Sequence, residues 1–475
     1  MFLEVALVLL ATVSILGIFN AILRPKNDFT RVGADPGPIG LRTWWARWKW
    51  YKGGHEQVRQ RYKEDDSYVV QTLMGDTVVL SPKCLHELKM LPESKLSSAE
   101  ALVDSVMGKY TGVDLLLRDH LTSDICRGLF KRSIPEFLPQ MAEKLDMILA
   151  ERLSGNTARG RPYPYFSFHA NPIWQTALTD LPVNIEITKF ILLPLPAISR
   201  PFIAPLIPQR RHLLFPRSDE LATAGKESSV MRLFIESGKD NDPDSIAASV
   251  ILHTYSMAIT NVMFDLCAMP KYINTLRSEA EEALSDEGGQ WRMSTIEQLR
   301  RLDSFLKESQ RLNHTTFLGF DRKVISAIRL SDGKTVLPAG ASIAMPGRPM
   351  SVDPTFYERP HEFDGLRFYC TGKGTEEYLS KLKGNTQQQL DYTGIEPGNL
   401  SWGSGRFTCP GRWYAAALIK LVVAKLLLSY DISFPLEQTQ RPGNTMYDTE
   451  VFPDMKQRIV LRKRDGAGVE GEVSE

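Results

Sequence analysis

Three parts of the chain have hydrophobic patterns that predict regular structure. Residues 5–23 form a low-charge run of 19 residues in which Asn20 is the only strongly polar member. Residues 244–268 are apolar on nearly every side of a helix, which predicts a helix that crosses the interior. Short β-type segments at 68–74 and 77–80, separated by a Gly-Asp pair, predict a hairpin.

The first apolar run is long enough to cross a lipid bilayer. At roughly 1.5 Å per residue it just spans a hydrocarbon core of about 30 Å. Glu4 precedes the run and Arg24, Lys26 and Arg31 follow it, and such a basic flank stays on the cytosolic side. A cleaved signal peptide is the alternative, but no basic segment precedes the run and no clear cleavage site follows. Residues 1–24 therefore predict one transmembrane helix, an uncleaved anchor in the endoplasmic reticulum with the bulk of the protein in the cytosol.

Residues 25–60 combine a chain break with an aromatic, basic segment. The Pro/Gly cluster at 35–38 marks a linker turn. Four tryptophans interleaved with basic residues follow, an arrangement typical of a helix at a membrane interface; packing into the core is the alternative. We interpret this stretch as a linker and interfacial segment that contains Trp44, Trp45, Trp48 and Trp50 with Arg42, Arg47, Lys49 and Lys52.

Composition narrows the function classes. The 57 basic and 56 acidic residues nearly cancel, so nothing indicates a nucleic-acid partner. The five cysteines form no Cys-x-x-Cys pair, which favours a reducing compartment and argues against structural zinc. Ten prolines lie between positions 162 and 216, so long helices are not expected in that stretch.

One loop near the C-terminus has the features of a ligand-presenting site. Glycines at 403 and 405 lead to Cys409, and Pro410 suits the first position of a helix. A thiol at a helix start feels the positive end of the helix dipole and free N–H groups, which favour the thiolate. The loop therefore predicts a soft anionic ligand presented to a metal, although a buried structural cysteine is the alternative.

This loop resembles the cysteine loop of the cytochrome P450 (haem-thiolate monooxygenase) family, aromatic-x-x-Gly-x-basic-x-Cys-x-Gly. Trp402, Gly405, Cys409 and Gly411 match the pattern, and the Cys-Pro-Gly-Arg sequence is similar to the fungal version. The resemblance implies a mainly α fold with small β-sheets, and haem b held by the Cys409 thiolate as axial iron ligand. The basic residue two before the cysteine is replaced by Phe407, and we expect the adjacent Arg406 to contact a haem propionate instead.

The same family has an acid-Thr pair on its central helix that relays protons to dioxygen. In this chain His253 and Thr254 occupy those places, similar to a fungal His-Thr-Thr variant, with Tyr255 in place of the second Thr. Histidine can relay protons near neutral pH. The alternative is a core histidine beside a threonine bonded to the i−4 carbonyl.

A further motif resembles the Glu-x-x-Arg pair that locks the family's proximal side. Glu308 and Arg311 lie at i and i+3 of a predicted helix, on one face. Arg367, in a Pro-His-Glu-Phe-Asp-Gly-Leu-Arg turn, matches the family's third member, and its planar guanidinium can bond two acceptors. An exposed surface ion pair is the alternative for Glu308 and Arg311.

The resemblance also assigns residues around the cofactor. Arg127 is the predicted second propionate contact, with a surface charge as the alternative. Thr315, Thr316, Phe317 and Phe452 are predicted to line an apolar substrate pocket. Residues 61–475 then form the catalytic domain, in which 155–240 would be an atypically short lid region.

The function implied by the resemblance is oxidation of a hydrophobic small molecule, in fungal secondary metabolism, with a terpenoid as one candidate. Electrons would come from an NADPH-dependent flavoprotein reductase in the same membrane. A basic surface for that reductase is predicted at Arg406, Arg412, Lys420 and Lys425. Two alternatives stay open: a haem-thiolate protein that catalyses a rearrangement or dehydration, or is inactive, and a membrane-anchored binding protein without haem.

Overall fold

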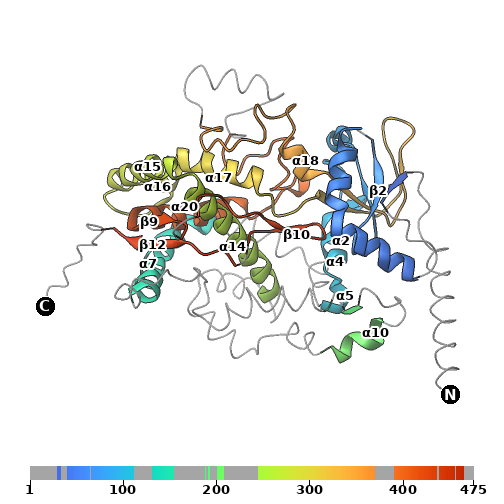
Figure 1. Cartoon of the computed structure of the whole chain (residues 1–475), viewed down its shortest axis with the longest axis horizontal. Coiled ribbons are helices and arrows are strands. Elements are labelled where there is room, and N and C mark those ends of the chain that lie inside the picture. Colours follow the sequence, from blue (N-terminus) through green and yellow to red (C-terminus); the bar gives the residue numbers. More distant parts are fainter. Residues whose placement is uncertain are drawn as a thin grey trace.

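The protein is mainly helical, with small β-sheets, as expected (Figure 1). A computed structural model describes residues 29–33, 40–64, 66–111, 131–154, 188, 191–192, 200–207, 244–369, 390–435, 438–454 and 456–464. The predicted anchor (1–24) and most of the predicted lid region (155–240) lie outside these residues. In the part of the chain that is described, no helix is both long and apolar enough to cross a bilayer.

A six-stranded sheet forms the β-rich end, at the right of Figure 1. Its strand order is β1-β2-β3-β8-β5-β4. The predicted hairpin is confirmed: β2 and β3 pair antiparallel, with Tyr68 opposite Val79. The strands are β1 (Thr30–Val32), β2 (Tyr68–Gln71), β3 (Asp76–Val79), β8 (Ser342–Met345), β5 (Gly319–Val324) and β4 (Leu96–Ser97).

Three two-stranded sheets complete the described β structure. In the hairpin of β10 and β11, Thr445 lies opposite Phe452. The pairs are β9 (Tyr430–Ser433) with β12 (Val460–Lys463), β10 (Thr445–Tyr447) with β11 (Glu450–Phe452), and β6 (Ile328–Arg329) with β7 (Val336–Leu337).

The described helices include the predicted interior helix, α14, which has the expected bounds Asp244–Ala268. The helix that follows the cysteine loop is α20 (Arg412–Ser429). The others are α2 (Gly40–Tyr62), α3 (Leu85–Leu88), α4 (Ser98–Ser105), α5 (Gly108–Thr111), α7 (Lys131–Ser154), α10 (Arg200–Ile203), α15 (Ile273–Asp286), α16 (Met293–Gln298), α17 (Arg300–Leu312) and α18 (Gly347–Ser351). Short 3₁₀ turns span Pro82–Cys84, Ala204–Leu206, Pro270–Tyr272 and Gly405–Phe407.

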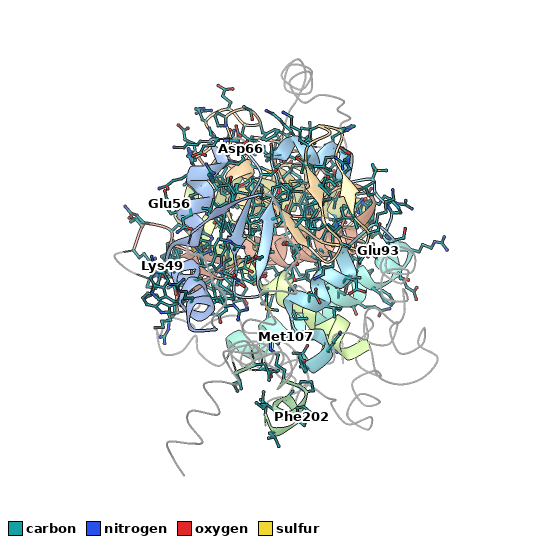
Figure 2. All side chains as sticks on the ribbon, turned by 90° about the vertical axis from the view of Figure 1, so that its right-hand side faces the viewer. Lys49, Glu56, Asp66, Glu93, Met107 and Phe202 are labelled. Carbon is teal, nitrogen blue, oxygen red and sulfur yellow. The ribbon has the colours of Figure 1, made fainter. Side chains whose placement is uncertain are left out.

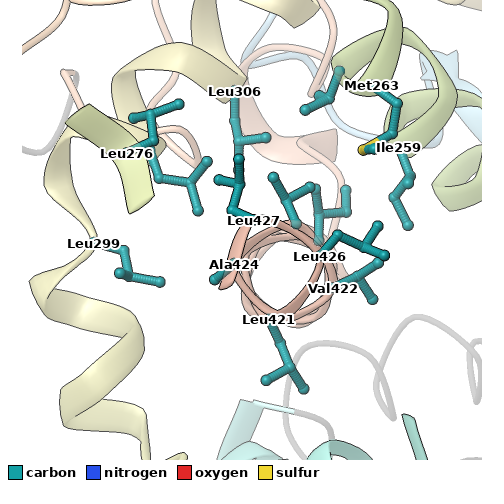
Figure 3. Close-up of a cluster of buried hydrophobic side chains, with 14 of the residues drawn as sticks. Ile259, Met263, Leu276, Leu299, Leu306, Leu421, Val422, Ala424, Leu426 and Leu427 are labelled. Carbon is teal, nitrogen blue, oxygen red and sulfur yellow. The ribbon is translucent and has the colours of Figure 1, made fainter. Parts of the chain in front are cut away.

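The largest core surrounds α20. Leucine, valine and alanine side chains leave this helix in nearly every direction and meet α14, α15 and α17 (Figure 3). Leu421, Val423 and Leu427 are fully buried, as are Leu276 and Leu306 on the neighbouring helices. Each buried leucine contributes about 1.5–3 kcal/mol relative to an exposed one. This packing fixes the position of the helix that carries the cysteine loop at its start.

Candidate functional site

Cys409 lies between the glycine loop and the start of α20. Its backbone N–H donates to Trp402 O at 2.7 Å, which folds the loop back on itself. Pro410 and Gly411 form a turn, so α20 begins at Arg412 rather than at Pro410 as predicted. Arg412 closes this turn by donating from Nη1 to Cys409 O at 2.9 Å. The cysteine is therefore held just before the helix, half-buried.

Opposing effects act on the Cys409 thiol. Burial raises its pKa, and this effect is the largest. The backbone N–H groups of Gly411 and Arg412 and the charge of Arg412 act in the opposite direction. The helix start thus favours the thiolate, as predicted, but burial outweighs it in the protein alone. A bound cation at the sulfur would supply the missing stabilisation.

The glycine loop needs glycine at two positions. Gly403 and Gly405 have φ of 76° and 71°, in the left-handed region that other residues seldom adopt. A Cβ at Gly405 would overlap the backbone carbonyl of Lys89. Arg406 N–H donates to that same carbonyl at 3.1 Å, and Thr408 Oγ1 donates to Gly405 O at 2.6 Å. The loop therefore rests directly on the backbone that follows α3.

α14 passes beside the cysteine loop at the predicted His253-Thr254 pair. The ring of the next residue, Tyr255, is buried, with its centroid 6.2 Å from that of Tyr414. The Tyr255 hydroxyl would lie 3.7 Å from a Cβ on Gly411. The Thr254 side chain is exposed, one residue from this contact. The backbone of His253 belongs to α14, and its side chain lies outside the described residues.

Glu308, Arg311 and Arg367 meet in the interior. Arg311 donates from Nε and Nη2 to the two carboxylate oxygens of Glu308, both at 2.8 Å. Arg367 Nε bonds the same oxygens at 3.1 and 3.0 Å. Glu308 and Arg311 are fully buried, so the surface-bridge alternative does not describe this pair. One carboxylate thus joins two guanidinium groups.

The remaining donors of the two arginines hold the chain after α18. Arg311 Nη1 donates to Ser351 O and Pro360 O, each at 2.7 Å. Arg367 Nη2 donates to Glu362 O at 2.9 Å. These carbonyls belong to the last residue of α18 and to the irregular backbone after it. The triad therefore supplies hydrogen bonds that a continuing helix or a sheet would otherwise supply.

Two further buried charges on α17 fix the segment that leads to the cysteine loop, and sequence reasoning missed them. Asp303 accepts the N–H of Tyr392 at 2.6 Å and pairs with Lys420. Lys307 Nζ donates to Asp391 O at 3.0 Å. The Tyr392 carbonyl in turn accepts the Trp402 indole N–H at 2.7 Å. The sequence signal was a run of charged residues on a helix, which usually indicates a solvated face.

The predicted reductase surface is wrong at two of its four residues. Lys420 and Lys425 are only 7% and 5% exposed. Lys425 Nζ donates to Asp146 Oδ1 at 2.6 Å, and Lys420 pairs with Asp303. Both lie on α20, which is enclosed by other helices, and each pairs with a carboxylate: Asp303 is buried, whereas Asp146 is exposed. Arg406 is exposed and Arg412 half-buried.

The predicted pocket residues come from two segments that the structure joins. Thr316 forms an antiparallel bridge with Glu450 on β11, the strand that ends with Phe452. Thr315, Thr316 and Phe452 are half-buried. Phe317 is fully buried, and the structure places its ring in the core beneath α2 rather than on an open surface.

A buried polar network on α14, which sequence reasoning also missed, fastens the segment before β10. Asp265 accepts from Ser309 Oγ at 2.5 Å, Asn313 Nδ2 at 2.9 Å and Arg441 Nε at 2.5 Å. Arg441 also bonds Asn261 Oδ1 at 2.6 Å. Burial raises the pKa of Asp265 to about 6, against the opposing charge of Arg441. An Asp and an Asn within an otherwise apolar helix were the available signal.

Of the two predicted propionate contacts, Arg127 and Arg406, the structure describes only Arg406. Arg127 lies outside the described residues, and so does the side chain of Phe407. Arg406 is placed on the cysteine loop by its backbone bond to Lys89 O. The described site therefore consists of Cys409 with two N–H groups directed at its sulfur, beside α14.

This donor set fits a cofactor-borne iron. A single thiolate ligand, with N–H groups at the sulfur, leaves the other ligand positions to a macrocycle. Thr254 is exposed on α14 and directly precedes Tyr255, whose hydroxyl approaches Gly411. Cys409 and the N–H groups at its sulfur therefore fit a haem iron.

Comparison with known proteins gives consistent matches. The family model described as Cytochrome P450 matches residues 246–454. An ent-kaurene oxidase of Gibberella intermedia is 30% identical over 465 residues, covering 89% of this chain and 86% of the relative.

Two monooxygenases are similar over nearly the same length. The cytochrome P450 monooxygenase AtmP of Aspergillus flavus is 29% identical, covering 86% of this chain and 84% of the relative. The cytochrome P450 monooxygenase paxP of Penicillium paxilli is 29% identical, covering 82% of this chain and 81% of the relative.

Proposed function

Because the chain belongs to the cytochrome P450 family, a family of monooxygenases that use haem with a cysteine thiolate ligand, we propose that it oxidises a terpenoid or similar hydrophobic scaffold in fungal secondary metabolism. The family implies a hydrophobic substrate and a redox-partner reductase. The similarity to a relative named ent-kaurene oxidase supports the terpenoid class.

The position of Cys409 is the observation that carries this proposal. We assign Cys409 as the axial ligand of the haem iron, because its sulfur lies at a helix start with two backbone N–H groups directed at it. N–H groups at a ligating sulfur lower its negative charge and so tune the potential of the metal. No other described cysteine precedes a long helix: Cys267 is near the end of α14, and Cys84 closes a short turn.

The other site residues have supporting roles in the proposal. Bound haem supplies dioxygen reduction and oxygen insertion. Thr254 and His253 would deliver protons from solvent to the reacting oxygen, since a hydroxyl can relay a proton and an imidazole titrates near neutral pH. Arg406 and Arg127 would pair with the propionates. Glu308, Arg311 and Arg367 would hold the proximal backbone.

The enzyme would lie at a membrane. Residues 1–24 would anchor it in the endoplasmic reticulum, residues 25–60 would lie at the interface, and residues 61–475 would face the cytosol. An NADPH-dependent flavoprotein reductase in the same membrane would supply electrons. This orientation is supported by the acidic residue before the apolar run and the basic residues after it.

The ligand assignment is tested by substitution of the cysteine. Cys409→Ala should remove the Soret band that a thiolate-ligated haem gives on reduction and exposure to carbon monoxide. Cys84→Ala, at another half-buried cysteine, should retain that band. An unchanged spectrum in Cys409→Ala would show that another residue is the ligand.

Turnover under isotopically labelled dioxygen distinguishes a monooxygenase from a haem-thiolate isomerase or dehydratase, and an absorption spectrum distinguishes both from a protein without haem. A monooxygenase places one labelled atom in the product when the reductase and NADPH are present. A haem-thiolate isomerase or dehydratase would give unlabelled product without NADPH. A protein without haem would show no Soret band at all.

A further inference from the structure

The helix α2 has two faces of different character. Its buried face repeats every four residues along the helix, at Ala46, Trp50, Gly54 and Val58. A Cβ at position 54 would overlap the Trp50 indole, so glycine there lets the indole lie flat along the helix. This face packs on the β-rich part of the protein, in the cluster that contains Phe317.

The opposite face of α2 exposes aromatic rings among positive charges. Trp45, Trp48 and Tyr51 are 48%, 47% and 41% exposed. Lys49 Nζ lies 4.0 Å from the centroid of the Trp45 ring, and Lys52 Nζ lies 5.5 Å from that of Trp48. We call these five residues the basic–aromatic face.

The charge of this half of α2 has one sign. From Gly40 to His55 the helix contains four basic residues and no acidic residue. In Figure 2, Lys49 lies at the lower left edge, and Phe202, which is 76% exposed, lies near the bottom of the same view. Exposed indole rings with lysines around them match the headgroup region of a bilayer that carries acidic lipids.

The buried face of α2 is bonded to the turn of the β10–β11 hairpin. Trp50 Nε1 donates to Asp448 Oδ1 at 2.8 Å, and His55 Nε2 bonds Asp448 O at 2.7 Å. A carbonyl can only accept, so His55 donates. The backbone N–H of Leu73 adds a third bond, to Asp448 Oδ1 at 3.1 Å. Asp448 is buried, with φ of 55° in the turn.

The hairpin continues this connection to the predicted substrate pocket. Phe317 N–H donates to Thr449 O at 2.6 Å, and Val451 N–H donates to Thr315 O at 2.8 Å. The rings of His55 and Phe317 meet edge to face with centroids 4.7 Å apart. The helix α2 is therefore exposed on one side and contacts the pocket segments on the other.

We propose that α2 docks on an acidic lipid surface through its basic–aromatic face and, through Asp448, fixes the β10–β11 hairpin, so that contact with acidic lipid steadies the substrate pocket. This inference rests on the proposed function, because the pocket is the substrate site only in an oxygenase of this family. Asp448, Trp50 and His55 are positioning residues in it, since they act through the hairpin.

The test uses the full-length haem protein in nanodiscs of phosphatidylcholine, with or without phosphatidylserine. Amide hydrogen exchange is followed in peptides that cover 45–52 and 445–452. Acidic discs should slow exchange in both peptides by roughly fivefold relative to neutral discs. The anchor is present in both kinds of disc, so it does not account for the difference.

Two kinds of variant separate the steps. Lys49→Gln with Lys52→Gln should abolish the lipid effect in both peptides, because two surface charges are removed. Asp448→Gly removes the Oδ1 acceptor of both bonds and tolerates the left-handed turn, so it should keep the effect at 45–52 and lose it at 445–452. Trp50→Phe, which keeps an aromatic ring and removes the Nε1 donor, should behave in the same way as Asp448→Gly.

Three results would overturn the proposal: equal exchange of the hairpin in both discs, an unchanged lipid response in the double lysine variant, or protection that requires the reductase instead of the lipid. The last result would assign the face to a protein partner. The Soret band of each variant with carbon monoxide is recorded alongside. If the unmodified protein shows no such band, the proposed function is contradicted. If it shows the band but no lipid effect, only this inference is contradicted.

Discussion

His314 is a buried imidazole with an incomplete set of partners. It is 1% exposed, and its Nδ1 lies 3.4 Å from Thr316 Oγ1, whereas Nε2 has no hydrogen-bond partner among the described residues. Burial, and then the charge of Arg348, lowers its pKa to about 4. The folded protein therefore holds this ring neutral at pH values where an unfolded chain would protonate it.

Substitution of His314 should change the pH dependence of stability. A depressed pKa gives stability that is present above the unfolded value of 6.5 and is lost as the pH falls towards 4. The loss attributable to this ring is at most about 3 kcal/mol. The melting temperature of His314→Leu should therefore fall less than that of the parent protein when the pH is lowered from neutral towards 4.

The matched control is His361→Gln, because that ring is exposed to solvent. This substitution should leave the pH dependence of the melting temperature unaltered. Parallel profiles for His314→Leu and the parent would show that the buried ring does not resist protonation.

At the scale of single elements, α17 does more than pack. Most of its polar side chains are buried, and several, among them Asp303, Lys307 and Glu308, bond irregular backbone. Glu308 is the centre, since it bonds Arg311, Arg367 and the N–H of Asp364, the last at 2.9 Å. Removing one buried charge leaves the others uncompensated, which costs about 3–5 kcal/mol.

Glu308→Gln should accordingly yield little folded protein, with the melting temperature of any soluble fraction sharply lowered. Arg367→Lys should be milder, because lysine keeps the charge but loses the planar fork. Glu362→Gln is the control: its pair with Arg359 has the same i, i+3 spacing but is more than 60% exposed on both sides. If all three variants melt alike, the buried triad contributes no more than a surface pair.

At the scale of the whole molecule, the cysteine loop is supported from both ends of the fold. α20 enters the helical core, and the glycine turn before Cys409 rests on the carbonyl of Lys89, next to the six-stranded sheet. The β10–β11 hairpin is likewise fastened by α2 at Asp448 and by α14 through Arg441. The site is thus assembled from segments hundreds of residues apart in sequence.

Gly405→Ala tests this support. The substitution puts a side chain at φ of 71° and against the Lys89 carbonyl, and the strain of the left-handed backbone alone is about 1–2 kcal/mol. We expect a lower melting temperature and reduced haem content. Gly443→Ala, where a Cβ meets nothing within 4 Å, should change neither. Full haem content in Gly405→Ala would show that the loop can shift without loss of the site.

Local patterns alone determined much of this protein. The apolar helix at 244–268, the hairpin at 68–79 and the glycine turn before Cys409 depend on neighbouring residues, because periodicity and backbone freedom are local properties. The order of the motifs then identified the family. The i, i+3 spacing of Glu308 and Arg311 also predicted that both residues lie on one face of their helix.

Only the tertiary structure decided which charges are buried. Lys420, Lys425 and Asp303 look like surface charges in sequence, and Asp448 looks like an ordinary turn residue. Each acquires its partner from a segment far away along the chain, and burial depends on what the whole fold lays over a position. The link from α2 through Asp448 to the pocket is of this kind, because contact across a fold leaves no trace in local sequence.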